Sequence, residues 1–183
     1  MQKVEIQATP NPATMKFMFD KVLTEEPHDF VSAAEASRSP LASKIFGFPW
    51  ASGVYIGRNF VTVTKQEWVD WDVLAEPLAG LIGEHIESGE PILAPLDTRA
   101  GEDFDENDSP IVQKIKEILN RDIRPVVALD GGDIAFSKYE EGILYIHMKG
   151  ACSGCPSSTA TLKQGIEVRI RELLPEVKEV LSI

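Results

Sequence analysis

A strongly acidic stretch interrupts the chain and limits how much of it can share one hydrophobic core. Residues 97–108 read DTRAGEDFDEND, and Pro95 and Pro110 flank them. A segment with so many like charges and so few apolar side chains cannot offset the entropy cost of folding, so it is typical of an exposed linker. We therefore predict two small domains, residues 1–96 and 109–183, joined by a linker over residues 97–108.

Regular spacing of apolar residues predicts a sheet packed with helices in the first domain. The predicted elements are strands over residues 4–8, 15–19, 54–56 and 60–64, a capped short helix over residues 40–46, and a longer helix from near Glu76 to Gly89. Pro77 sets the start of the longer helix, because proline is tolerated only in a first helical turn. Five bulky side chains are predicted to pack structurally: Trp50, Trp68, Trp71, His28 and His85.

The second domain is predicted to have the order α-β-β-α-β, which makes the whole chain α+β. Ser109-Pro110 predicts a helix start, and the pattern breaks at Pro125 before a hairpin with its turn at Glu140-Glu141-Gly142. A helix follows from Pro156, and a short strand ends the chain. We expect this last strand to lie parallel to the strand that precedes the cysteines.

The two cysteines of the chain stand together in Gly150-Ala151-Cys152-Ser153-Gly154-Cys155-Pro156, between a predicted strand and a predicted helix. Two soft ligands at this spacing suit a thiophilic metal or a dithiol redox pair. Because Pro156 predicts the first turn of a helix, we expect the helix dipole to lower the pKa of one or both thiols. His147, in the preceding strand, is predicted to pack or face water rather than to bind metal.

Three kinds of site remain open for Cys152 and Cys155. A structural zinc ion needs four ligands, and one chain supplies two cysteines without a suitably spaced histidine pair. A thiol-disulfide oxidoreductase would use the pair at a helix start, although no Trp precedes the first cysteine and no Pro lies between the two. An iron-sulfur cluster could take two thiolates from each of two chains at a dimer interface. The ligand count favours the shared cluster.

The charge distribution excludes two classes of partner. The chain has 18 basic and 29 acidic residues, a net charge of −11, and no basic stripe. Contacts with phosphates need clustered Lys and Arg, so we predict no binding to nucleic acid and none to a membrane. No apolar run approaches the roughly 18 residues of a membrane span. Two cysteines without an export signal predict a reducing compartment, which we take to be the cytoplasm.

The motifs of both domains resemble the NifU/Nfu family. The matching motifs are distributed over nearly the whole chain. They are Thr9–Pro12, Met15–Phe17, Ser39–Ala42, Phe60–Lys65, Pro125–Asp133, Gly150–Pro156, Thr161–Lys163 and Leu174–Val177. The resemblance implies an iron-sulfur cluster scaffold or carrier, not an enzyme, which holds a labile 4Fe-4S cluster between two protomers. Cys152 and Cys155 fall on the cluster-ligand positions of the family. The implied partners are a second copy of the chain, upstream assembly factors and apo iron-sulfur proteins that receive the cluster.

Overall fold

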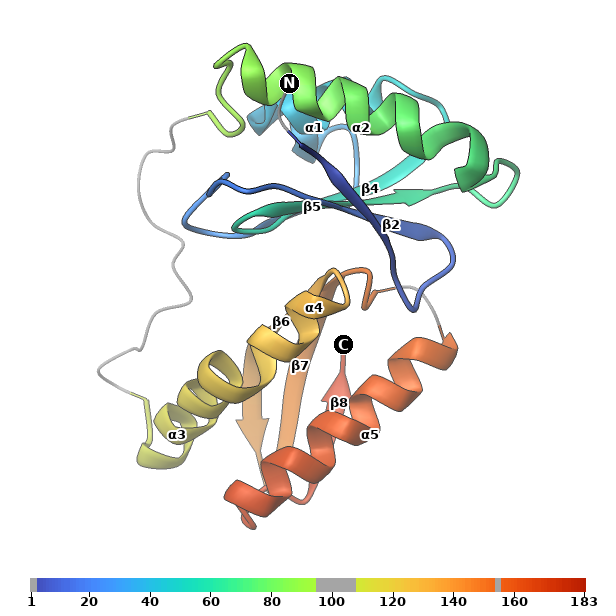
Figure 1. Cartoon of the computed structure of the whole chain (residues 1–183). Coiled ribbons are helices and arrows are strands. Elements are labelled where there is room, and N and C mark those ends of the chain that lie inside the picture. Colours follow the sequence, from blue (N-terminus) through green and yellow to red (C-terminus); the bar gives the residue numbers. More distant parts are fainter. Residues whose placement is uncertain (1–2, 95–107, 154–155) are drawn as a thin grey trace. The chain divides into compact units, whose positions relative to one another are not determined.

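The computed structural model describes residues 3–94, 108–153 and 156–183 of the chain (Figure 1). The chain divides into two compact units, Met1–Asp97 and Thr98–Ile183. All but one residue of the predicted linker lies outside the described residues, so the predicted domain limits stay a prediction. Within the described ranges, no helix has both the length and the apolar character needed to cross a bilayer.

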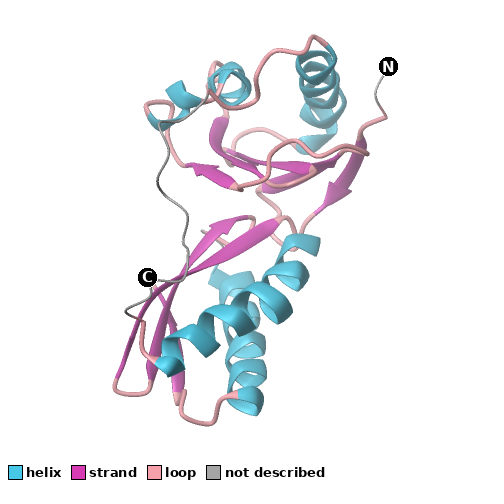
Figure 2. Cartoon of the chain, turned by 90° about the vertical axis from the view of Figure 1, so that its left-hand side faces the viewer, coloured by secondary structure: helices cyan, strands magenta, loops and turns pink. Residues whose placement is uncertain are grey.

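The first unit is a five-stranded antiparallel sheet with helices on one face (Figures 1 and 2). The strand order is β1-β2-β5-β4-β3. Phe17, Val61 and Ile56 lie opposite one another on β2, β5 and β4, and all three are fully buried in the core with side chains of α1 and α2. The elements are β1 (Glu5–Ala8), β2 (Thr14–Met18), β3 (His28–Phe30), the 3₁₀ turn η1 (Glu35–Arg38), α1 (Pro40–Phe46), β4 (Ala51–Ile56), β5 (Phe60–Lys65) and α2 (Trp71–Glu87).

The start of α1 follows the prediction, whereas the start of α2 does not. Ser39 caps α1, since its side-chain oxygen accepts a hydrogen bond of 3.0 Å from the Ala42 N–H. Helix α2 begins at Trp71, five residues before the predicted start, and contains Pro77 in its interior. Trp71 and Leu74 pack against the buried core, so tertiary packing outweighs the local cost of the proline.

The exposed fractions of three of the five bulky side chains test the prediction that these side chains are packed. Trp50 is 9% exposed and His85 is 2% exposed, which confirms that both are packed. The prediction is wrong for Trp68, which is 68% exposed. Trp68 lies in the turn between β5 and α2, where side chains commonly face the solvent.

The second unit is a three-stranded sheet of order β6-β7-β8 with its helices on one face (Figures 1 and 2). Its elements are α3 (Pro110–Ile118), the π-helical turn η2 (Leu119–Ile123), α4 (Arg124–Leu129), β6 (Gly132–Glu140), β7 (Ile143–Gly150), α5 (Pro156–Leu173) and β8 (Glu179–Ser182). The predicted order α-β-β-α-β is confirmed, and β7 and β8 are parallel as expected. The regular helix α3 ends before Pro125, but helical structure continues beyond the predicted break until Leu129, because Pro125 stands in the first turn of α4, where a missing N–H costs little.

His85 is a buried histidine on α2 with charged neighbours at the surface. Its side chain has no exposed area, and its Nε2 lies 3.3 Å from the Pro91 carbonyl oxygen. Its Nδ1 lies 3.5 Å from the Glu90 carboxylate, which pairs with Lys44 at 2.7 Å. Burial, followed by the charge of Lys44, lowers the pKa of His85 from its ordinary 6.5.

This burial predicts a loss of stability in mild acid. The unfolded chain takes up a proton at His85 more readily than the folded chain, so the free energy of unfolding should fall as pH decreases below about 6.5. His85→Gln keeps a hydrogen-bond donor for Pro91 and cannot be protonated, so it should flatten this slope. Urea unfolding at a series of pH values between about 7.5 and 5.5 measures the slope. Equal slopes in the two chains would show that His85 is not responsible.

Candidate metal centre

The segment that carries Cys152 is a tight turn at the carboxyl end of β7. Gly150 ends the strand with φ of +63°, and the Ser153 N–H and hydroxyl both donate to the Gly150 carbonyl, at 3.1 and 2.8 Å. The Ala151 N–H donates to the carbonyl of Gly131 at 3.2 Å, and Gly131 itself has φ of +80°. These left-handed conformations favour glycine, so Gly131 and Gly150 fix the turn against the start of β6.

The Cys152 thiol points into the core of the second unit. Cys152 is 4% exposed and belongs to the buried apolar cluster formed by the sheet and helices. Its sulfur occupies the space where a side chain at Gly132 would stand, because a methyl group on Gly132 would overlap the sulfur. Gly132 pairs with Gly150 across the β6–β7 hairpin, so the thiol lies beside the residue pair at the open end of this hairpin.

The expectation of a lowered pKa is wrong for Cys152. Burial raises the pKa of this thiol from 9.0 to about 12, and the negative charges of Asp130 and Asp133 act in the same direction. The helix dipole acts most strongly within the first turn of a helix, and Cys152 lies four residues before Pro156, the first residue of α5. Desolvation therefore outweighs the dipole, and Cys152 is a protonated thiol at neutral pH.

An ion pair beside the turn joins α4 to β6. Both oxygens of the Asp133 carboxylate accept hydrogen bonds from the Arg124 guanidinium, at 2.8 Å from Nε and 2.6 Å from Nη2. The Asp133 side chain is 6% exposed, and Arg124 Nη1 also donates to Asn120 at 3.0 Å. A bidentate pair of this kind fixes orientation as well as charge. The sequence alone does not predict this ion pair, because the motif that contains Asp133 does not show which side chain contacts its carboxylate.

The remaining candidate ligands do not gather around Cys152. Cys155 lies outside the described residues, so its role as a ligand stays a prediction. His147 is exposed, and its Nδ1 lies 3.2 Å from the backbone oxygen of Ile183, so it contacts the residue that follows β8. In the part of the chain that the structure describes, no three His, Cys, Asp or Glu side chains are grouped to hold a metal ion.

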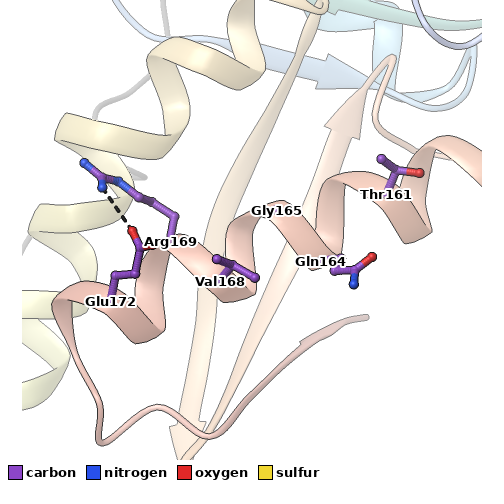
Figure 3. Close-up of a pocket in the computed structure, with 6 residues that line it drawn as sticks. All are labelled: Thr161, Gln164, Gly165, Val168, Arg169 and Glu172. Atoms are coloured by element: carbon purple, nitrogen blue, oxygen red, sulfur yellow. Dashed lines mark hydrogen bonds and ion pairs between the residues drawn. The ribbon is translucent and has the colours of Figure 1, made fainter.

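A shallow hollow along α5 is a separate surface feature (Figure 3). Its described lining residues all belong to this one helix: Thr161, Gln164, Gly165, Val168, Arg169 and Glu172. Its two charged side chains, Arg169 and Glu172, pair with each other at 3.2 Å. None of these side chains is a thiol or an imidazole, so the hollow lacks the ligands that a soft metal prefers.

Comparison with known proteins gives one family for both units. The family "Scaffold protein Nfu/NifU N terminal" matches residues 4–89, and the family "NifU-like domain" matches residues 115–181. The NFU1 iron-sulfur cluster scaffold homolog of Homo sapiens, named as mitochondrial, is 40% identical over 98% of this chain and 71% of its own length. The chain belongs to the NifU/Nfu family. The resemblance seen in the sequence motifs is thereby confirmed, and so is the mixed helix-and-sheet fold class.

Two further matches place this NifU/Nfu chain among its relatives. The NFU1 homolog of Drosophila erecta is 38% identical over 98% of this chain, which spans 64% of that relative's length. The solution structure of a NifU-like protein from Saccharomyces cerevisiae aligns with 52% of this chain and 87% of its own, at 21% identity and a TM-score of 0.47. The chain is thus shorter than the full-length fruit-fly relatives that it matches.

The predicted cytoplasmic location is wrong. The human and Drosophila erecta relatives of this NifU/Nfu chain are both named as mitochondrial proteins. The prediction depended on reduced cysteines and on the first residues of the sequence. Reduced cysteines show that a compartment is reducing, and they do not distinguish one such compartment from another.

The raised pKa of Cys152 can be measured directly. In Cys155→Ala, Cys152 is the remaining cysteine, and we expect the folded chain to show no thiolate absorbance below about pH 10 because burial and Asp130 favour the thiol. The same chain in denaturant should titrate near 9.0. Asp130→Asn should lower the folded pKa without changing the shape of the side chain. Thiolate in the folded chain at a pH below 9.0 would contradict the burial that the structure shows.

Proposed function

We propose that this chain is a non-catalytic iron-sulfur cluster scaffold or carrier that binds a 4Fe-4S cluster between two protomers and transfers it to apo-proteins. The observation that carries the proposal is the ligand count. The chain has two cysteines, Cys152 and Cys155, whereas a 4Fe-4S cluster takes four thiolates. Two chains complete the set. The relatives named as iron-sulfur cluster scaffolds support the same function.

The donors of the proposed site fit this cargo in their chemistry. Thiolate sulfur is the ligand that iron-sulfur clusters require, and the buried Cys152 directly precedes the exposed Ser153 in the turn. Cys152 itself must leave the core and lose its proton before it can bind iron. Both steps cost free energy that is recovered when the cluster departs. A ligand of this kind suits a carrier, which must release what it binds.

An apolar surface beside the turn supports a second copy as the other half of the site. On α4, Val126 is 57% exposed and Leu129 is 73% exposed, one turn apart. Leu129 lies two residues before Gly131, whose carbonyl anchors the cysteine turn. Exposed large apolar side chains close to half a site fit burial against the chain that supplies the other half.

The charge of the second unit also permits two copies to approach. The whole chain has a net charge of −11, whereas residues 109–183 carry ten basic and ten acidic residues. Like charges across an interface oppose association, so a neutral unit is the part of this acidic chain best suited to meet its copy. We infer that the second unit carries the cluster and that apo iron-sulfur proteins and assembly factors are the further partners.

A thiol-disulfide oxidoreductase is the competing function, and the state of Cys152 weighs against it. Dithiol enzymes attack through a thiolate whose pKa is lowered and whose sulfur is accessible. Cys152 is 4% exposed and its pKa is raised to about 12. In this state the sulfur is a poor nucleophile.

Removal of one proposed ligand tests the cluster directly. After anaerobic reconstitution, the unmodified chain should hold about four irons and four sulfides per two chains and show broad visible absorption. Cys152→Ala should lose the iron, the sulfide and the absorption, because two of the four ligands disappear from each pair. Ser137→Ala, a comparable truncation elsewhere in the same unit, should keep them. A Cys152→Ala chain that retained the full cluster would refute the proposed function.

A charge on the apolar surface of α4 should weaken pairing. Leu129→Glu places a carboxylate where we expect two copies to meet, so the concentration needed for cluster-loaded pairs should rise by about tenfold or more. Anaerobic analytical ultracentrifugation measures this concentration. Leu173→Glu, at the far end of α5 and 41% exposed in the present structure, serves as the matched control and should have little effect. Equal effects of the two substitutions would exclude α4 as the contact surface.

A further inference from the structure

Gly132 stands against Cys152 so closely that a larger residue would not fit there. A Cβ atom added to Gly132 would overlap the Cys152 sulfur, and it would lie 3.0 Å from the Cys152 Cβ and 2.9 Å from the Lys149 carbonyl oxygen. Contacts below 3.0 Å are essentially never made by real Cβ atoms, so the Cys152 sulfur would have to move, and the Lys149 carbonyl would have to shift slightly. The thiol is the easiest group to displace, because it lies at the end of a side chain.

Position 132 requires glycine because neighbouring atoms leave no room for a side chain, and not because of its backbone φ angle. Gly131 and Gly150 have φ of +80° and +63°, so a side chain at either would be strained whatever the space around it. Gly132 has no such φ, and it lies in β6 in regular pairing with Gly150. An alanine at position 132 would therefore compete mainly for the space that the sulfur occupies, and it would also press on the Lys149 carbonyl oxygen.

In the proposed function, the Cys152 sulfur has two alternative positions. One is the space beside Gly132, and the other is on the cluster. In the present structure Cys152 is 4% exposed and packed in the apolar core. A ligand to a cluster shared by two chains must instead reach the surface where the chains meet. These two positions exclude each other, because one sulfur cannot be in the core and on the cluster together.

We propose that Gly132 is a positioning residue whose missing side chain provides a niche for the Cys152 thiol in the cluster-free chain, so that the niche competes with the cluster for this ligand. The proposal rests on the proposed function, in which Cys152 is a cluster ligand. A ligand that is available for only a fraction of the time binds more weakly by that fraction. The niche thus lowers the affinity for the cluster and favours its release to a recipient.

Thiol labelling in the cluster-free chain tests the niche without any cluster. In the Cys155→Ala background, iodoacetamide should label Cys152 at least about tenfold more slowly in the folded chain than in the unfolded chain, because labelling requires local opening. Adding Gly132→Ala should bring the folded rate to within about threefold of the unfolded rate. Gly165→Ala is the matched control, since no atom lies within 4 Å of a Cβ at Gly165, and it should leave the rate unchanged.

The labelling outcomes separate the niche from a general effect on folding. Slow labelling of the folded chain that carries Gly132→Ala would overturn the proposal. Labelling of the folded chain that keeps Gly132 at the rate of the unfolded chain would also overturn it. If Gly132→Ala lowers the unfolding temperature so far that no folded chain is left to label, the same substitution is made in the Cys152→Ala background. There the loss of stability should be smaller, because the overlap with the sulfur is gone and the contacts with the Lys149 carbonyl oxygen and the Cβ at position 152 remain. An equal loss in both backgrounds would also overturn the proposal.

Cluster retention in the otherwise unmodified chain tests the competition. Reconstituted Gly132→Ala should lose its cluster to an iron chelator about threefold to tenfold more slowly than the unmodified chain, because the freed thiol has no niche to return to. Faster loss, or the same rate, would contradict the competition. If neither chain takes up a cluster while labelling changes as expected, the proposed function fails and the niche for the thiol stands.

Discussion

The packing of one sulfur atom against one glycine determines the state of the candidate site. Because Gly132 has no side chain, the Cys152 thiol enters the core, where it is desolvated and its pKa rises to about 12. The turn around it is closed by the bond from Ala151 to Gly131 and by the two bonds to the Gly150 carbonyl. The cluster-free chain thus stores its thiol in a stable, unreactive form. If Cys152 is the proposed cluster ligand, binding has to open this arrangement.

The same arrangement explains how the chain could bind a cluster specifically and still release it, as the proposed function requires. Two cysteines in 183 residues are half of a four-ligand set, so the proposed binding of a 4Fe-4S cluster depends on a second chain. The Arg124–Asp133 pair and the pairing of Gly132 with Gly150 hold the strand ends that carry the turn. In the proposed function, these strands present a turn that has to open, and the cluster is held while two such turns face each other.

Local sequence signals predicted the elements that local interactions determine. The Ser39 cap, the hairpin of β4 and β5 and the order of the second unit follow from side chains within a few residues of one another. The errors arose where distant residues decide. Core packing extends α2 back to Trp71, and desolvation by residues remote in sequence keeps Cys152 protonated. Sequence spacing identified the candidate cysteines, but the contact with Gly132 required the register of β6 and β7.

Native mass spectrometry of the anaerobically reconstituted chain tests the central claim most directly. It reports the number of chains and the mass of the bound cluster in the same ion. If two chains share one site, the cluster mass will appear only on the two-chain species, once per pair, and single chains will carry none. A single chain that carries a complete 4Fe-4S cluster would contradict the account, because its two cysteines would then suffice.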